Sequence, residues 1–190
     1  MKINVIIPTY KPDEKFERNL RMLRRQTLQP DRILIINTEE SLFHSKEFGK
    51  LPQGEIIHIK KSEFDHGGTR NRAAAMCDGD IIVLLTQDAI PADEYLLENL
   101  TKPFEDPEVC AVYGRQMADW KDNPVEAYTR TFNYPKESRI KSKEDLPVLG
   151  IKTFFCSNVC AAYRKSVYDA MGGFPLHTIF NEDMIFASRL

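Results

Sequence analysis

The amino-acid sequence predicts an α/β fold in which a mostly parallel sheet is flanked by helices. Five short apolar runs alternate with loops or with segments of helical periodicity over residues 1–115. The apolar residues in these runs are continuous rather than alternating, which is typical of strands covered on both faces. Because strand–helix–strand crossovers are right-handed and return the chain in the same direction, we expect a doubly wound, largely parallel arrangement.

Each apolar run predicts one strand, and turn residues bound it. Residues 3–7 form the first run, which Pro8 ends, and residues 81–85 form the fourth and most apolar run. The other three strands are predicted at residues 33–36, 55–59 and 109–113. Short apolar runs of this kind, bounded by proline, glycine or asparagine, indicate buried strands.

The helices are predicted from periodicity and from capping residues. Large apolar residues recur at near-helical spacing over residues 16–28, with Asp13 as a start signal and Pro30 as a stop signal. An alanine-rich helix opens at residues 67–69, and a further helix starts at residues 91–93.

The C-terminal part of the sequence has a different character. Residues 114–150 are polar, with aromatic residues interleaved among charges and prolines, which predicts loops and short helices. These aromatic residues are Trp120, Tyr128, Phe132 and Tyr134. We expect a strand at residues 152–156, a helix over 162–171 capped by Gly172 and Gly173, and a last helix over 181–190. The last helix stops without a cap, which indicates an incomplete C-terminus.

Composition excludes several classes of partner. With 26 Lys and Arg against 28 Asp and Glu, the formal charge is −2. The sequence therefore lacks the basic excess that is typical of proteins that bind nucleic acid. The N-terminal apolar run is too short for a signal peptide or a membrane span. The four cysteines lack the spacing of a zinc site, so we expect free thiols and a cytoplasmic location. A length of 190 residues suits one domain.

Polar residues follow the predicted strands at the edge where an open α/β sheet binds its ligands. Residues 8–10 follow the first strand, residues 37–39 the second and residues 86–89 the fourth. Asp88 lies just past an apolar strand, where a carboxylate is costly unless it reaches solvent, a cation or a donor. A hard oxygen ligand there suits Mg²⁺ or Mn²⁺, which also bind substrate phosphates. The alternative role, an N-cap for the next helix, fits Asp93 better.

The segment after the third strand has two interpretations that stay open at this point. Gly67 and Gly68 at a helix start would let backbone N–H groups approach a phosphate, and Arg70 could add a bidentate contact. Equally, the two glycines could form only a tight turn and Arg70 a surface charge. The spacing matches neither of the common glycine-rich loops for ATP and for dinucleotides, which argues against an ATPase or an NAD enzyme.

Taken together, these segments resemble family 2 glycosyltransferases, which have the GT-A fold, over essentially the whole chain. The resemblance rests on five sequence blocks, at residues 6–10, 70–80, 86–89, 172–174 and 181–183. Residues 64–71 and 86–89 are similar to the bacterial rhamnosyltransferase branch. The resemblance implies one GT-A domain over 1–190, with a nucleotide-binding half at 1–115. The acceptor and catalytic-base half would be residues 116–190, incomplete at the C-terminus.

The resemblance also implies roles on the donor side, position by position. The residues that would bind the nucleotide-sugar are Pro8, Thr9, Tyr10, Asn37, Thr38, Arg70, Thr86 and Gln87. Among them, Asn37 and Thr38 replace an acidic pair that often contacts the pyrimidine. Thr86 replaces the first Asp of the Asp-x-Asp metal motif, while Asp88 is kept as the ligand of Mg²⁺ or Mn²⁺.

On the acceptor side, the resemblance places the general base at Asp183, with Glu182 beside it near the acceptor and Asn158 in the sugar pocket. A nucleoside diphosphate leaves readily once a metal offsets its charge, so no general acid is needed. One base is enough to activate the acceptor hydroxyl for in-line attack, which inverts the anomeric configuration. The alternative is that acidic residues occupy this first helical turn for dipole reasons alone.

The resemblance therefore implies metal-dependent, inverting transfer of a sugar, rhamnose in the similar branch, in cell-surface polysaccharide synthesis. The donor would be dTDP- or UDP-linked and the acceptor a glycan or a lipid-linked glycan. Peripheral association with the inner face of the membrane would come from regions outside this chain. Two alternatives remain: a sugar nucleotidyltransferase, which would need a basic glycine-rich loop after the first strand, and a nucleotide-binding or scaffold domain without turnover.

Overall fold

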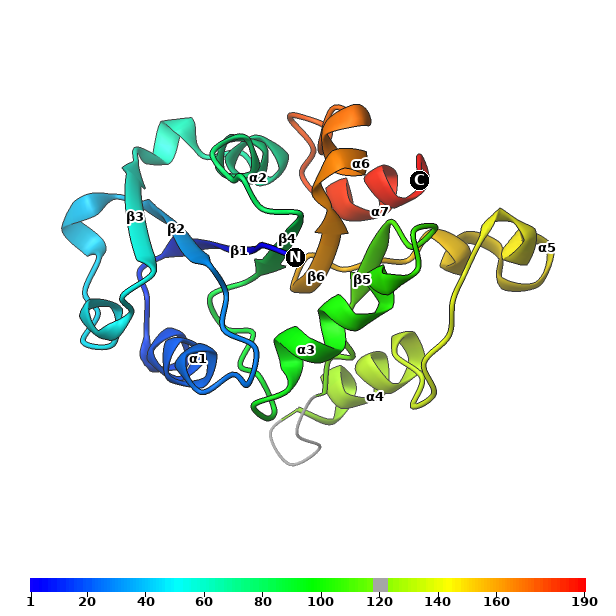
Figure 1. The fold of residues 1–190 in the computed structure, drawn as a ribbon, viewed down its shortest axis with the longest axis horizontal. Coiled ribbons are helices and arrows are strands. Elements are labelled where there is room, and N and C mark those ends of the chain that lie inside the picture. The colour runs from blue at the N-terminus through cyan, green and yellow to red at the C-terminus, as the bar shows by residue number, and fades with distance from the viewer. Residues whose placement is uncertain (118–122) are drawn as a thin grey trace.

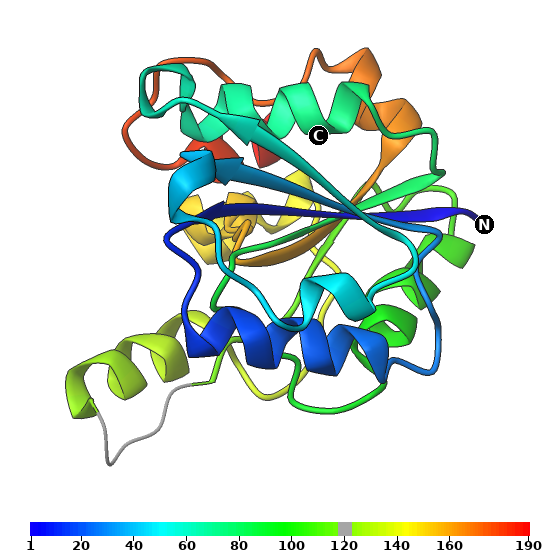
Figure 2. The same cartoon turned by 90° about the vertical axis from the view of Figure 1, so that its left-hand side faces the viewer.

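The computed structural model describes residues 1–117 and 123–190, so Trp120 lies outside the described residues. Within them, six strands form one sheet in the order β3-β2-β1-β4-β6-β5, with helices on both faces (Figure 1, Figure 2). The predicted α/β class is therefore confirmed. The strands are β1 (Ile3–Tyr10), β2 (Arg32–Thr38), β3 (Gly54–Ile59), β4 (Ile81–Leu85), β5 (Ala111–Tyr113) and β6 (Cys160–Arg164).

The helices cover the two faces of the sheet in separate groups. The described α-helices are α1 (Glu14–Arg24), α2 (His66–Ala75), α3 (Leu96–Thr101), α4 (Pro124–Asn133), α5 (Leu146–Leu149), α6 (Lys165–Ala170) and α7 (Glu182–Ala187). Helices α1 and α3 lie on one face, while α2, α6 and α7 lie on the other (Figure 1).

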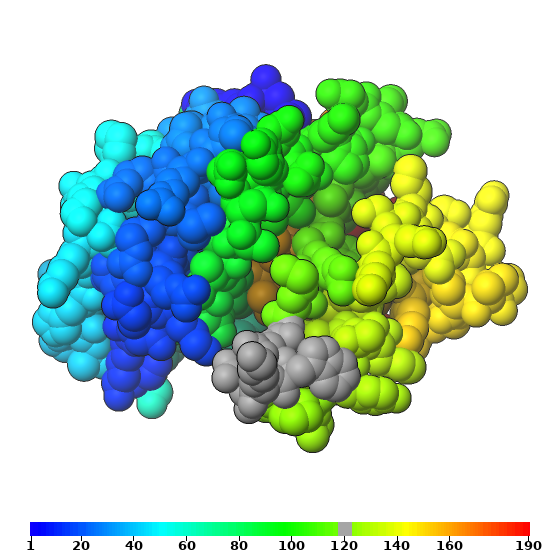
Figure 3. Space-filling model, turned by 90° about the horizontal axis from the view of Figure 1, so that it is seen from below, coloured from blue at the N-terminus to red at the C-terminus, as the bar shows by residue number. Residues whose placement is uncertain are grey.

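The sheet divides the apolar core into two clusters, one on each face, and β1 contributes residues to both. Val5 and Ile7 belong to the core on the α1 and α3 face, together with Phe16 of α1. Ile6, between them in sequence, belongs to the opposite core with Phe186 of α7. Since successive strand residues point to opposite faces, a continuous apolar run fills both cores at once. The space-filling view from below shows α1 in blue beside the green segment that contains α3 (Figure 3).

Strand direction changes along the sheet. The pairs β1–β2, β1–β4 and β2–β3 are parallel, which confirms the prediction for the first four strands. The pairs β4–β6 and β5–β6 are antiparallel. Strand β6 therefore lies between β4 and β5, next to the β5 edge of the sheet, and it inserts the C-terminal part of the chain between two earlier strands.

Two of the predicted strand ends were wrong. Strand β1 does not stop at Pro8 but continues to Tyr10, and β2 includes Asn37 and Thr38. Strand β4 pairs with β1 only as far as Ile6, so beyond that point β1 has one hydrogen-bonded neighbour. A proline, which lacks a backbone N–H, is tolerated where a strand is paired on one side only.

The predicted C-terminal elements also needed correction. Residues expected to form a strand at 152–156 lie largely in a 3-10 helix, Gly150–Phe154. The sixth strand is Cys160–Arg164, which takes the first residues of the helix predicted over 162–171. Its sequence, Cys-Ala-Ala-Tyr-Arg, has little strand preference of its own, but it pairs with a neighbour on each side. Tertiary pairing overrides local propensity here.

Helix ends agree with the capping signals in part. The Asp13 side chain accepts hydrogen bonds from the N–H groups of Lys15 and Phe16, as expected of an N-cap. Gly172 and Gly173 have φ values of +75° and +73°, which suits the glycines predicted after α6. Helix α1 ends at Arg24 and α7 at Ala187, both earlier than predicted, and α3 begins at Leu96 rather than at residues 91–93.

The cysteines agree with the free thiols expected from the sequence. All four cysteines are free thiols, and Cys77, Cys156 and Cys160 are buried. In residues 1–117 and 123–190, no helix combines the length and the apolar character needed to cross a membrane.

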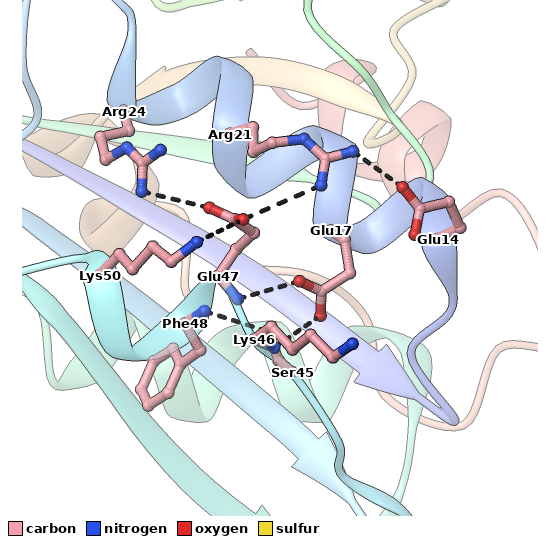
Figure 4. A network of polar contacts seen from close by, with 9 residues as sticks. All are labelled: Glu14, Glu17, Arg21, Arg24, Ser45, Lys46, Glu47, Phe48 and Lys50. Atoms are coloured by element: carbon pink, nitrogen blue, oxygen red, sulfur yellow. Dashed lines mark hydrogen bonds and ion pairs between the residues drawn. The ribbon is translucent and has the colours of Figure 1, made fainter.

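A charged cluster fixes the connection between β2 and β3 against α1 (Figure 4). Glu47 is only 7% exposed, and its carboxylate lies 3.1 Å from Arg24 Nη1 and 2.8 Å from Lys50 Nζ. Arg21 Nη1 is 3.9 Å away. The Glu17 carboxylate accepts the backbone N–H of Glu47 at 2.9 Å. The hydrogen bond from Lys50, together with the charges of Arg24 and Arg21, lowers the pKa of Glu47.

We predict that Glu47→Gln lowers the melting temperature at neutral pH. The folded-state pKa of Glu47 is lower than its unfolded value, so its contribution is present above the ordinary value of 4.5 and is lost as the pH falls through the lowered pKa. The difference in melting temperature from the wild type should therefore shrink in acid. Glu40→Gln, at an exposed position outside this cluster, is the control. Equal melting temperatures for Glu47→Gln and Glu40→Gln at neutral pH would contradict the prediction.

The two glycines at the start of α2 have different surroundings. A Cβ atom on Gly67 would lie 2.1 Å from the carbonyl oxygen of Pro175, so the close approach of α2 to this loop requires glycine. A Cβ atom on Gly68 would lie 3.1 Å from the Asp65 side chain. The Gly68 N–H donates to that same carboxylate at 2.6 Å, which caps the helix. The structure therefore favours packing over phosphate binding as the role of the glycine pair.

We predict that Gly67→Ala costs about 1–3 kcal/mol of unfolding free energy, because a methyl group would overpack a contact with backbone. Gly68→Ala is the matched variant, and it should stay within about 1 kcal/mol of the wild type because alanine is the better helix former. Urea unfolding of the two variants tests this. A smaller loss for Gly67→Ala than for Gly68→Ala would show that the contact with Pro175 is not tight.

Candidate active site

The first polar group of the candidate site lies at the carboxyl ends of β1 and β2. Thr9 Oγ1 donates to Asn37 Oδ1 at 3.0 Å, and both residues are almost fully buried. Asn37 Nδ2 lies 3.0 Å from Nδ1 of His58, on β3, and donates to the Glu39 carbonyl at 3.1 Å. The side chains of Thr9, Asn37 and His58 are therefore joined by hydrogen bonds across three strands. His58 was not predicted as a site residue. A single histidine within an apolar strand does not show which residue it faces until the register of β3 against β2 is known.

The ends of β1 and β4 are joined by a second set of hydrogen bonds. The Tyr10 N–H donates to Gln87 Oε1 at 2.9 Å, and the residue Tyr10 is 40% exposed. From α1, the buried amide of Asn19 donates to the carbonyl of Thr86 at 3.1 Å and to that of Gln87 at 3.4 Å. Sequence reasoning missed Asn19. Its position on the apolar face of α1, beside Phe16, is the signal that could have revealed it.

Asp88 lies at the exposed end of β4, as predicted. Thr86 Oγ1 donates to Asp88 Oδ1 at 2.7 Å, so the residue at the first motif position orients the carboxylate of the third. Within residues 1–117 and 123–190, no three His, Cys, Asp or Glu side chains converge as a metal cluster. An exposed carboxylate beside a hydroxyl still fits a hard cation, because Mg²⁺ is commonly held by one carboxylate with substrate phosphates and waters.

A second polar group surrounds the start of α7. Asp183 Oδ2 accepts the backbone N–H of Asn158 at 3.1 Å, and Oδ1 accepts the N–H of Met184 at 2.8 Å. The Asn158 amide donates to Glu182 Oε1 at 3.3 Å. Burial raises the pKa of Asp183, and the neighbouring charge of Glu182 adds to this, while the Asn158 N–H acts in the opposite direction.

Arg70 belongs to this second group rather than to the strand ends of β1 and β2. It is 6% exposed, and its Nη1 atom lies 3.4 Å from Glu182 Oε1 and donates to the His66 carbonyl at 2.8 Å. Its Nε atom is buried without a hydrogen-bond partner in the described part of the chain. The sequence alone did not predict this pair, because α2 and α7 are far apart along the chain.

The structure thus arranges the predicted residues in two groups. The strand-end group contains Thr9, Tyr10, Asn37, Thr86, Gln87 and Asp88. The α7 group contains Arg70, Asn158, Glu182 and Asp183. Pro8 and Thr38 lie in the same strand ends as the first group, half-buried and buried. The Thr86 N–H donates to the Val159 carbonyl at 3.1 Å, which joins the two groups through the backbone beside Asn158.

Comparison with known sequences identifies the family of the chain. Residues 4–172 match the family model described as Glycosyl transferase family 2. The chain is 43% identical to the O-antigen chain rhamnosyltransferase RfbN of Salmonella typhimurium, over 100% of this chain and 61% of that protein. It is 44% identical to the O-antigen chain rhamnosyltransferase WbaN of Salmonella anatum, over 98% and 59%. The chain spans about three fifths of the length of these relatives.

Solved structures confirm the fold. A mannosyltransferase from Pyrobaculum calidifontis, in complex with GDP-Man and Mn²⁺, superposes with a TM-score of 0.69 at 20% identity, over 99% of this chain and 51% of that one. TarS 1–349 of S. aureus, in complex with UDP-GlcNAc, gives 0.67 at 16% identity, over 98% and 52%. The predicted GT-A architecture is therefore confirmed, and the chain belongs to glycosyltransferase family 2.

Proposed function

We propose that the chain catalyses metal-dependent, inverting transfer of a sugar from a nucleoside-diphosphate donor to a glycan or lipid-linked acceptor in cell-surface polysaccharide synthesis. The observation that carries the proposal is Asp183: a half-buried carboxylate with a raised pKa, fixed by two backbone N–H groups. Similarity to two O-antigen rhamnosyltransferases supports rhamnose as the sugar, and dTDP- or UDP-linked sugars are the donors that we propose.

The donor would bind at the strand-end group. Pro8, Thr9 and Tyr10 would frame the base, with Asn37 and Thr38 beside them. The exposed Tyr10 ring offers a stacking surface, and the hydrogen bond from its N–H to Gln87 fixes the backbone next to it. Because Thr9 and Asn37 are buried and already bond to each other, they would support the donor site from within the sheet.

Asp88 would hold the metal, Mg²⁺ or Mn²⁺, together with the diphosphate of the donor. A bound metal would supply charge neutralisation for the leaving nucleoside diphosphate. The Thr86 hydroxyl holds Oδ1 of Asp88, which leaves Oδ2 for the metal. A structural neighbour with Mn²⁺ and GDP-Man supports this use of a divalent metal.

Asp183 would act as the general base for the acceptor hydroxyl. Burial raises its pKa, which makes its carboxylate a better proton acceptor than an ordinary surface Asp. Glu182 is engaged by Arg70 and by Asn158, so Asp183 is the carboxylate of the pair that is free to take a proton. Asn158 would lie between the sugar and the base. A lipid-linked acceptor would bring the chain to the inner face of the membrane.

We predict that Asp183→Asn lowers the transfer rate by about 10²–10⁴-fold and leaves nucleotide binding intact, because an amide cannot take the proton. Transfer would be measured from dTDP- and UDP-linked sugars with Mn²⁺, and binding by calorimetry. In the wild type, activity should rise with pH through the raised pKa of Asp183, above the ordinary value of 3.8, because the base must be ionised. Turnover retained by Asp183→Asn would exclude it as the base.

We predict that Asp88→Asn weakens Mn²⁺-dependent nucleotide binding by about tenfold or more, because the metal loses its charged ligand. Binding without metal should change little. Asp93→Asn, on the same exposed connection, is the control and should bind like the wild type. Unchanged metal-dependent affinity in Asp88→Asn would count against the metal role, and no binding by the wild type would favour a scaffold function.

A further inference from the structure

A buried hydrogen-bond chain leads from the core to the carboxylates of α7. Tyr163, on β6, is 1% exposed, and its hydroxyl donates to Asn158 Oδ1 at 2.8 Å. The Sγ atom of Cys156, also buried, lies 3.3 Å from the same hydroxyl. Asn158 continues the chain, with its side-chain amide on Glu182 and its backbone N–H on Asp183. Neither Tyr163 nor Cys156 has a role in the reaction proposed above.

The protonation states of Cys156 and Tyr163 decide which group donates each hydrogen bond in this chain. Burial raises the pKa of the Cys156 thiol to about 11, and burial also raises the pKa of Tyr163 well above 10. Both groups are therefore protonated near neutral pH, so the thiol can donate to the hydroxyl while the hydroxyl donates to Asn158 Oδ1. Because Oδ1 is occupied by a donor, the amide nitrogen of Asn158 is directed to Glu182.

We propose that Tyr163 is a positioning residue for Asp183 and acts through Asn158. Its hydroxyl fixes the Asn158 side chain, and with it the backbone N–H that holds Asp183 Oδ2. The proposal rests on the base role of Asp183 in the proposed function, but the geometry of the chain does not depend on that role. Cys156, Tyr163 and Asn158 are buried and joined by hydrogen bonds, and connected buried polar groups favour one arrangement of their members, which is what a preorganised base requires.

Other charged and titratable groups also surround Asp183. Glu182 raises its pKa, and Arg70 of α2 lowers it. Tyr134, just after α4, and Cys156 are close enough for its charge to act on their own pKa values. Glu182, Arg70 and Tyr134 are not bonded to the Tyr163 hydroxyl, and Cys156 loses its contact with that hydroxyl but stays an uncharged thiol because burial raises its pKa. An altered pKa of Asp183 in Tyr163→Phe therefore reports on the hydrogen-bond chain.

Tyr168 provides a matched control from the same aromatic cluster. Its ring centroid lies 6.0 Å from that of Tyr163, and both rings pack against Phe174 and Phe186. The Tyr168 hydroxyl donates to Asn71 Oδ1 rather than to Asn158. Tyr163→Phe and Tyr168→Phe therefore each remove one buried hydroxyl from one core, but only the first breaks the chain to Asp183.

The decisive measurement is the pKa of Asp183, from NMR titration of carboxyl carbons assigned with Asp183→Asn. We expect Tyr163→Phe to raise this pKa by about half a unit or more, because the N–H that favours the charged form is no longer held in place. Tyr168→Phe should leave it unchanged. In an Asn158→Ala background, Tyr163→Phe should have no further effect, because its action passes through Asn158.

Steady-state kinetics of the transfer reaction provide a second test, independent of the NMR titration. Tyr163→Phe should lower kcat about tenfold with an unchanged KM for the donor, and should shift the acid limb of the pH profile upward. Equal pKa shifts in Tyr163→Phe and Tyr168→Phe would overturn the proposal. If Tyr163→Phe does not fold, Asn158→Ala removes the side chain through which Tyr163 acts, and an unshifted pKa of Asp183 in that variant would overturn the proposal. Absence of transfer by the wild type would reject the proposed function while leaving the titration valid.

Discussion

The hydrogen bond from the Thr86 N–H to the Val159 carbonyl, at 3.1 Å, extends the antiparallel ladder between β4 and β6 beyond its last paired residues. The ladder pairs Leu85 with Cys160, so the segment just before β6 must run alongside the segment just after β4. Asp88 follows one of these strands and Asn158 precedes the other. The candidate site depends on this pairing, because without it the two polar groups would have no fixed relation.

This arrangement gives two carboxylates different surroundings. Asp88 is exposed and holds a hydroxyl donor on one oxygen, so it stays accessible to a cation from solvent. Asp183 is half-buried and held by two backbone N–H groups. Burial disfavours the charged form of Asp183 and so raises its pKa. A raised pKa suits a carboxylate that accepts a proton, whereas a metal ligand must stay ionised. The environments of the two carboxylates therefore support the proposed roles of Asp88 toward the donor and of Asp183 toward the acceptor.

Sequence patterns were sufficient where local chemistry decides the structure. Strands β1 to β4 follow from continuous apolar runs, and Asp13 caps α1 because a carboxylate at that position can accept free N–H groups. Strand β6 could not be predicted in this way. Its residues become a strand because β4 and β5 offer partners on both sides, which is a property of the assembled sheet.

The same distinction applies to the candidate site. Asp88 could be placed from the sequence, since a carboxylate after a strongly apolar strand needs only the strand to locate it. The partners of Asn37 and Asn158 could not, because each depends on a register or on a contact between distant segments. Thr9 and His58 meet Asn37 only once three strands are aligned. Cys156 and Tyr163, which have no sequence signal of their own, are visible only as parts of a buried chain.

The ion pair between Arg70 and Glu182 gives the adjacent carboxylates of Glu182 and Asp183 different electrostatic surroundings. A buried pair of this kind adds little net stability, but removal of one partner leaves an uncompensated charge. Glu182 has Arg70 at 3.4 Å and the Asn158 amide at 3.3 Å, so its negative charge is largely satisfied. Asp183 has no cation as close within the described residues, and the charge of Glu182 raises its pKa further. In the proposed reaction, Arg70 would therefore act on the site by neutralising Glu182, and Asp183 would be the carboxylate that accepts the proton.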